Sequence, residues 1–201
     1  AEPGAGVIAK VAAGCRALHA GPRFCSDFDM FALQPKYLRV VLENGFRLPT
    51  DYQDHAERFE RARRALTATA TATVPCHNDL LAANIIEHGD RVWLIDYEYS
   101  GNNDPCFELG NIWRECRLST DQLEELVAAY YGRALRHMLA RARLQGTVSQ
   151  YGWTLWGCIQ NGSSALDFDF WSWSMERYEN AVAEFTGADF DDLLDDAQRD
   201  D

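Results

Sequence analysis

Three polar side chains, Asp79, Asn84 and Asp96, stand in and around short apolar segments at a spacing suited to phosphate and metal chemistry. Asp79 and Asn84 belong to the loop "HNDLLAAN", and Asp96 ends the apolar segment "VWLID". Transfer of a phosphoryl group to an alcohol needs a carboxylate that takes the hydroxyl proton, and oxygen ligands that hold Mg²⁺ on a triphosphate. We therefore predict that Asp79 is a general base and that Asn84 and Asp96 are Mg²⁺ ligands, with ATP as the co-substrate.

The same loop matches the pattern H-x-D-L-x-x-x-N of protein-kinase catalytic loops. An isolated H-x-D means little, so the match depends on Asn84 at the right offset and on Asp96 at the end of a strand. The pair Cys76-His77 could also suggest a transition-metal site, although no second pair at ligand spacing supports one. We interpret His77 as a structural residue whose hydrogen bonds hold the loop.

A second group of residues is aromatic. Seven rings lie within 23 residues, at Tyr151, Trp153, Trp156, Phe168, Phe170, Trp171 and Trp173. A quaternary ammonium ion is held by ring faces, each contributing about 0.5–2 kcal/mol, together with a nearby carboxylate. Trp153 and Trp156 could also be core residues three apart on a helix, and we interpret Phe168 and Phe170 as packing residues.

The elements that position these residues are predicted to be mostly helical. Apolar spacing, caps and breakers indicate helices over residues 7–19, 29–45, 52–68, 106–116, 120–144, 148–166 and 170–185. Ser119 or Thr120 can cap the fifth of these. Two β-branched segments about Gly89-Asp90 indicate one hairpin, and "TATATATV" is interpreted as a connector. We predict an α+β fold, predominantly α, in which one small β-hairpin carries the catalytic and metal-binding loop.

Composition limits the partners. A net charge of −12 argues against nucleic acid and anionic membranes, and favours a small cationic substrate. No apolar run approaches the ~20 residues of a membrane span. Six cysteines without a C-x-x-C pair indicate reduced thiols in a cytoplasmic protein. We predict one domain over residues 1–187, and a frayed acidic tail over 188–201 that holds seven aspartates between Asp189 and Asp201.

The stretches "VPCHNDLLAANII" and "LIDYEYSGNNDPCFELGNIWRE" resemble the choline/ethanolamine kinase family, which is related to the aminoglycoside phosphotransferases and the protein-kinase-like superfamily. The resemblance implies a kinase-like C-terminal lobe with the roles given above for Asp79, Asn84 and Asp96. It also implies a choline pocket and a supported catalytic loop. The pocket would be lined by Trp153, Trp156, Trp173, Tyr99 and, as counter-charge, Glu115, and the loop would be supported by His77 and Glu98.

Two features depart from the family pattern. Glu108 stands where the family more often has aspartate, and we expect this to have a small effect. The Gly-rich loop and strand lysine of an ATP-covering lobe are not found, since Lys10 and Lys36 both fall in helical segments. We therefore expect an N-terminal kinase lobe upstream, and weak or no turnover by this chain alone.

Three functions remain open at this point. The first is ATP-dependent phosphorylation of choline, ethanolamine or a related amino alcohol. The second keeps the same centre but acts on an aminoglycoside or thiamine, in which case acidic residues would dominate the acceptor pocket. The third is a non-catalytic remnant that binds a quaternary ammonium ligand.

Overall fold

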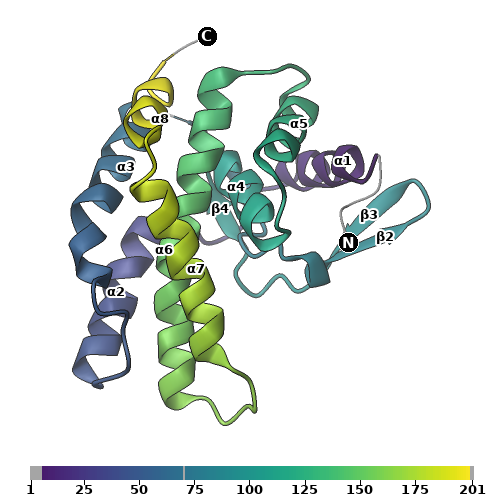
Figure 1. The fold of residues 1–201 in the computed structure, drawn as a ribbon. Helices are drawn as coiled ribbons and strands as arrows, with labels where there is room; N and C mark the ends of the chain where they lie inside the picture. The colour runs from purple at the N-terminus through teal and green to yellow at the C-terminus, as the bar shows by residue number, and fades with distance from the viewer. Residues whose placement is uncertain (1–5, 70, 200–201) are drawn as a thin grey trace.

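Two antiparallel helices, α6 (Arg136–Ser163) and α7 (Phe170–Phe185), run side by side through the fold (Figure 1). The structure is a computed structural model that describes residues 6–69 and 71–199. The other helices are α1 (Val7–His19), α2 (Met30–Glu43), α3 (Ala56–Ala68), α4 (Pro105–Glu115), α5 (Thr120–Tyr131) and α8 (Phe190–Asp196). Short 3-10 turns at Tyr52–His55 and Ala82–Asn84 complete the helical part.

The strands form two separate antiparallel ladders. β1 (Val74–Cys76) pairs with β4 (Gly101–Asn103), and β2 (Ile85–His88) pairs with β3 (Arg91–Leu94). The β2–β3 hairpin projects from the body of the protein (Figure 1) and turns at Gly89, which has a positive φ of 63° that glycine adopts without strain. The loop of residues 77–84 connects β1, in the first ladder, to β2, in the second.

The fold class is confirmed, because the described chain is mostly helical with a small amount of β structure. The first ladder was missed by the sequence analysis. "VPC" and "GNN" are too short and too polar to show strand periodicity, and they pair only because the loop between them folds back. The segment read as a connector therefore ends in a strand at Val74.

The predicted division into helices 120–144 and 148–166 is wrong. α5 ends at Gly132, which has a φ of 77° and so stops the helix in the left-handed conformation. α6 then continues for 28 residues through Gly146. A Cβ on Gly146 would lie 2.7 Å from the carbonyl oxygen of Gly110 on α4, so this glycine permits close helix packing and does not break the helix.

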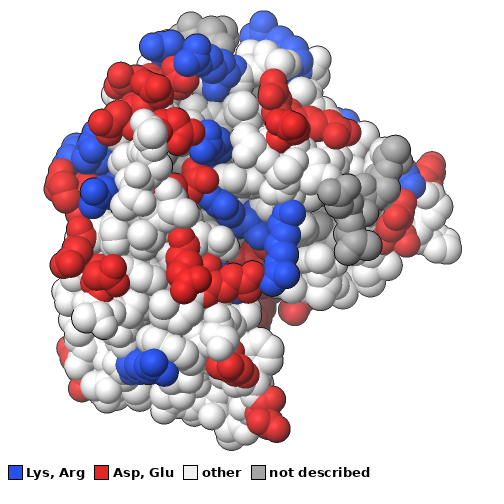
Figure 2. Space-filling view, in the orientation of Figure 1, with Lys and Arg blue, Asp and Glu red and all other residues white. Residues whose placement is uncertain are grey.

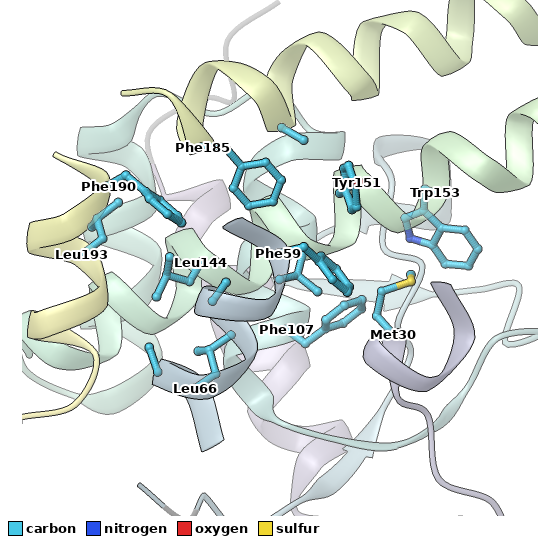
Figure 3. Close-up of a cluster of buried hydrophobic side chains, with 14 of the residues drawn as sticks. Met30, Phe59, Leu66, Phe107, Leu144, Tyr151, Trp153, Phe185, Phe190 and Leu193 are labelled. Carbon is cyan, nitrogen blue, oxygen red and sulfur yellow. The ribbon is translucent and has the colours of Figure 1, made fainter. Parts of the chain in front are cut away.

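Two clusters of buried apolar side chains hold the elements together. The larger cluster lies between α2, α3, α6, α7 and α8, and Figure 3 shows its rings converging from several helices. At its centre the rings of Tyr52 and Tyr151 stack with centroids 4.1 Å apart, and each hydroxyl donates to the other residue's carbonyl oxygen. The smaller cluster joins α1, α4 and α5 beneath the β2–β3 hairpin. Trp153 belongs to the larger cluster, close to Met30 in Figure 3.

The expectation of a frayed acidic end is wrong for residues 188–199. Residues 190–196 form α8, whose apolar side packs Phe190, Leu193 and Leu194 into the larger cluster. Asp191 and Asp192, between these apolar residues, are exposed, and Arg61 pairs with Asp191. Asp189 and Asp196, which flank the apolar residues, pair with Arg143 and Arg136. The apolar residues of this segment have helical spacing. The sequence analysis missed the helix because the many aspartates around them have low helix propensity. Residues 200 and 201 lie outside the described chain.

Charges of both signs alternate over the face drawn in Figure 2, so that this face carries no continuous basic surface. None of the described helices is long and apolar enough to cross a membrane. All six cysteines are free thiols.

Candidate active site

A buried carboxylate fixes the start of the catalytic loop. Glu108 on α4 is fully buried, and its two oxygens accept hydrogen bonds of 2.8 Å from the backbone N–H groups of His77 and Asn78. A carboxylate that receives two backbone N–H donors holds both peptide units in place. Glu108, which stands where the family more often has aspartate, thus pairs locally with the loop. Its longer side chain reaches the loop and bridges two consecutive residues.

Asn78, which the sequence analysis did not single out, shapes the next step of the loop. It has a φ of 67°, in the left-handed region that asparagine tolerates better than most residues. Its side-chain amide donates to the carbonyl oxygens of Tyr99 and Gly101 at 3.0 and 3.2 Å, and its Oδ1 accepts from Asn103. The loop is thereby bonded to the segment that leads into β4. An asparagine directly before the candidate base was the sequence signal for this turn.

His77 links the loop to the end of the hairpin. Its ring Nδ1 accepts from the backbone N–H of Asp79 at 3.3 Å, and its Nε2 donates to the carbonyl oxygen of Ile95 at 2.7 Å. This assigns the tautomer with the proton on Nε2. The ring also packs against Tyr97, with centroids 4.7 Å apart. Both bonds are to backbone groups, so the geometry suits the holding role inferred for His77 from the sequence.

Asn84 lies between the two candidate acidic residues. Its amide nitrogen donates to the carbonyl oxygen of Asp79 at 2.9 Å, and its own carbonyl oxygen accepts from the backbone N–H of Ile95 at 3.1 Å. Asp96, the residue after Ile95, is exposed and has a φ of 67°. The bond to the carbonyl oxygen of Asp79 uses the amide nitrogen of Asn84, so its side-chain Oδ1 is the atom that would serve as a metal ligand. An amide oxygen beside an exposed carboxylate is a hard-oxygen donor set that suits Mg²⁺.

Asp79 lies in an environment that disfavours its charge. Burial is the main cause that raises the pKa of this carboxyl to about 7, and the carboxylates of Glu115, Glu98 and Asp96 add to the effect. Arg177 acts in the opposite direction. A carboxyl group whose pKa lies near neutrality can both accept and release a proton at physiological pH.

Asp79 opens onto a cavity of about 350 Å³. The cavity is lined by residues from the catalytic loop, from the segment after β3, and from α4, α6, α7 and the α6–α7 connection, namely Asp79, Leu81, Glu98, Tyr99, Glu115, Trp153, Trp156, Leu166, Phe168, Phe170 and Trp173. All five predicted substrate-binding residues are thus brought together in one space with the candidate base. Asn84 and Asp96 are not among its described lining residues, although Asn84 is hydrogen-bonded to the backbone of Asp79.

The rings of the cavity contact one another at steep angles. Tyr99 and Trp153 have centroids 4.9 Å apart at 76°, and Trp156 contacts Trp173 at 5.3 Å and Phe170 at 5.9 Å. Trp153 is 4% exposed, so it belongs to the core although it also lines the cavity. Phe168 and Phe170, interpreted from the sequence as packing residues, both line the cavity; Phe170 is buried, and Phe168 is 55% exposed.

The carboxylates of the cavity differ from the roles inferred for them. Glu115 is buried and already paired, since it accepts from the guanidinium of Arg177 and, at 2.7 Å, from the side-chain amide of Gln150. Arg177 also lies 3.3 Å over the ring of Trp173 and occupies one face of it. Glu98, expected to support the loop, is exposed and faces the cavity. The free counter-charges are therefore Glu98 and ionised Asp79, whereas Glu115 orients Arg177.

Sequence comparison finds relatives for much of the chain. The family model described as "Choline/ethanolamine kinase" matches residues 41–131. Over 134 residues the chain is 31% identical to ethanolamine kinase 2 of Rattus norvegicus, a match that covers 56% of this chain and 35% of the relative. The chain thus spans about a third of the length of that curated relative.

Comparison with solved structures extends the match to nearly the whole chain. A choline/ethanolamine kinase family protein from Mesorhizobium loti superposes with a TM-score of 0.90 at 31% identity, covering 96% of this chain and 67% of the other. Choline kinase LicA of Streptococcus pneumoniae has a TM-score of 0.74 at 21% identity, with 89% and 62% covered, which shows a shared fold.

Proposed function

Because the chain belongs to the choline/ethanolamine kinase family, we propose that it forms the acceptor-binding and catalytic lobe of an ATP-dependent phosphotransferase. The acceptor is the hydroxyl of choline or a closely related amino alcohol. The observation that carries the proposal is the shared space of Asp79 and the ring-lined cavity. A small cation held among the rings would have its hydroxyl arm at the carboxylate.

The lining supports an amino alcohol over a larger polyhydroxylated amine. Eight of the eleven lining side chains are aromatic or leucine, and Glu98 and Asp79 supply negative charge that no described arginine or lysine pairs with. Ring faces attract a methylated ammonium ion, which has no N–H groups to satisfy. An aminoglycoside would need many polar partners along its length, and this lining does not supply them.

The roles of the residues follow from their positions. Asp79 accepts the proton of the acceptor hydroxyl, and its pKa near 7 matches the pH at which it must act. His77, Asn78 and Glu108 hold the loop so that the carboxylate is placed before the substrate arrives. Asn84 and Asp96 would hold Mg²⁺, which when bound neutralises charge on the phosphates of ATP.

We further propose that these 201 residues alone transfer phosphate slowly. The two lysines of the sequence lie on α1 and α2, and Lys10 is bonded to Glu87 at 2.6 Å and to the carbonyl oxygen of Gly89. Neither is held on a strand above the phosphates, where it would neutralise their charge.

Calorimetric binding and ³¹P NMR turnover, measured on the same samples, test the proposal. We expect choline to bind wild type, and Asp79→Asn to remove formation of phosphocholine while choline affinity stays within about tenfold. Asp90→Asn, a matched change at the tip of the hairpin, should alter neither. Absence of choline binding would overturn the proposed substrate. Choline binding with no phosphocholine from wild type would instead support a non-catalytic binding module.

A further inference from the structure

Beneath the catalytic loop, three potential metal ligands from three different elements converge. His19 ends α1, Cys76 ends β1, and Glu108 lies on α4, and all three are buried. One ligand atom from each lies within 4.8 Å of the others. His19 Nε2 is 3.5 Å from Glu108 Oε1 and 3.6 Å from Cys76 Sγ. The cluster is separate from the cavity described above.

The distance between His19 and Glu108 is long for a hydrogen bond. Nitrogen–oxygen hydrogen bonds have lengths of about 2.7–3.2 Å, and a buried ionic pair would be expected at the short end. In a tetrahedral zinc site, ligand bonds of about 2.05 Å to nitrogen, 2.1 Å to oxygen and 2.3 Å to sulfur give N···O and N···S separations of about 3.4 and 3.6 Å. The N···O separation of 3.5 Å and the N···S separation of 3.6 Å agree with that geometry.

The surroundings of the cluster orient its ligands. His19 Nδ1 lies 2.7 Å from the hydroxyl of Tyr130, so a proton on Nδ1 leaves the lone pair of Nε2 directed toward Cys76 and Glu108. Glu108 Oε1 accepts one backbone N–H and retains a second lone pair. Support of this kind from outer hydrogen bonds is typical of built metal sites.

The charges of the cluster also balance around a divalent ion. A thiolate and a carboxylate together neutralise Zn²⁺, while the histidine ligand is neutral, so the occupied site buries no net charge. Burial raises the pKa of the Cys76 thiol well above its usual range, so the metal must displace the thiol proton. The Cys76 thiol donates to the carbonyl oxygen of Asn103 at 3.7 Å, and this is the proton that a metal would displace.

We propose that His19, Cys76 and Glu108 form a structural site for one zinc ion. It would tie α1, the strand before the catalytic loop and α4 into one unit. This proposal does not depend on the proposed function, because none of its ligands lines the substrate cavity.

The test is the metal content of the folded chain, produced in cells grown with added zinc or, separately, with cobalt. We expect about one zinc ion per chain in wild type, and a loss of at least about tenfold in Cys76→Ala. Cys158→Ala, which removes a buried thiol from the other core cluster, should retain the metal. The cobalt form should show a thiolate-to-metal absorption band.

The cobalt spectrum of wild type decides the matter even where Cys76→Ala does not fold. A wild-type chain with no more zinc than Cys76→Ala, or a cobalt sample without the thiolate band, would overturn the proposal. The cluster would then be a network of hydrogen bonds only.

Discussion

At the scale of single residues, the site depends on carboxylates whose different surroundings give them different tasks. Glu108 is buried and anchors two backbone N–H groups, Glu115 is neutralised by Arg177, and Asp79 is left partly buried among other acids. Sequence motifs singled out Asp79 as the candidate base, and the structure places it in the lining of the cavity. They could not separate Glu98 from Glu115, because the pairing of Glu115 depends on an arginine 62 residues away in the chain.

Asp79 should make the stability of the protein depend on pH. Its pKa is about 7 in the folded chain, against an ordinary value of 3.8. Between these values the folded protein holds a proton that the unfolded chain has released, so stability falls as pH rises from about 4 to about 7. In buffer containing a metal chelator, Asp79→Asn should be more stable than wild type at pH 8, by on the order of 2 kcal/mol, and its advantage should be clearly smaller at pH 5.

Urea unfolding followed by circular dichroism at the two pH values measures this difference. Asp90→Asn provides the control, because Asp90 is exposed at the hairpin turn and its substitution should change stability equally at both pH values. An advantage of Asp79→Asn that is the same at pH 5 and pH 8 would show that the carboxyl group titrates normally.

At the scale of elements, the site depends on the close contact of α4 with α6. α4 carries Glu108 and Glu115, and α6 carries Trp153 and Trp156. The two helices cross at Gly110 and Gly146, where a Cβ on Gly110 would lie 2.2 Å from the carbonyl oxygen of Ala142. This spacing aligns the anchor of the loop with the rings of the cavity.

Gly110→Ala should therefore lower both stability and choline affinity. The added methyl group meets backbone atoms that cannot move aside, so we expect a loss of about 2–4 kcal/mol in the free energy of unfolding. Gly187→Ala, where the nearest atoms lie at 3.1 Å or more, should have a smaller effect. Urea denaturation and calorimetric choline titration measure the two quantities. Retention of wild-type stability in Gly110→Ala would contradict the account of this helix contact.

The elements also show what periodicity could and could not predict. Helices with a clear apolar side, such as α1, α3 and α7, lie where their spacing placed them. α6 was divided wrongly, because Gly146 has the same appearance in sequence whether it breaks a helix or allows another helix to approach. β1 and β4 were missed, because their pairing is imposed by the folded loop between them and leaves no pattern in either segment.

At the scale of the whole molecule, charge and shape favour a small cation. The net charge of −12 attracts cations at long range, although the face in Figure 2 mixes both signs. Locally the cavity adds aromatic faces, Glu98 and Asp79. The sequence predicted these residue types, but not that Arg177 would cover one face of Trp173 and withdraw Glu115 from the substrate.

The most direct measurement is a pair of calorimetric titrations of the chain, with choline and with 3,3-dimethylbutan-1-ol, its uncharged isostere. Both ligands have the same shape and hydroxyl, so their difference isolates the attraction of the cation for the rings and carboxylates. We predict that choline binds at least about tenfold more tightly, and that Trp156→Leu reduces this preference. Equal affinities for the two ligands, or a preference for choline that Trp156→Leu leaves unchanged, would contradict the account.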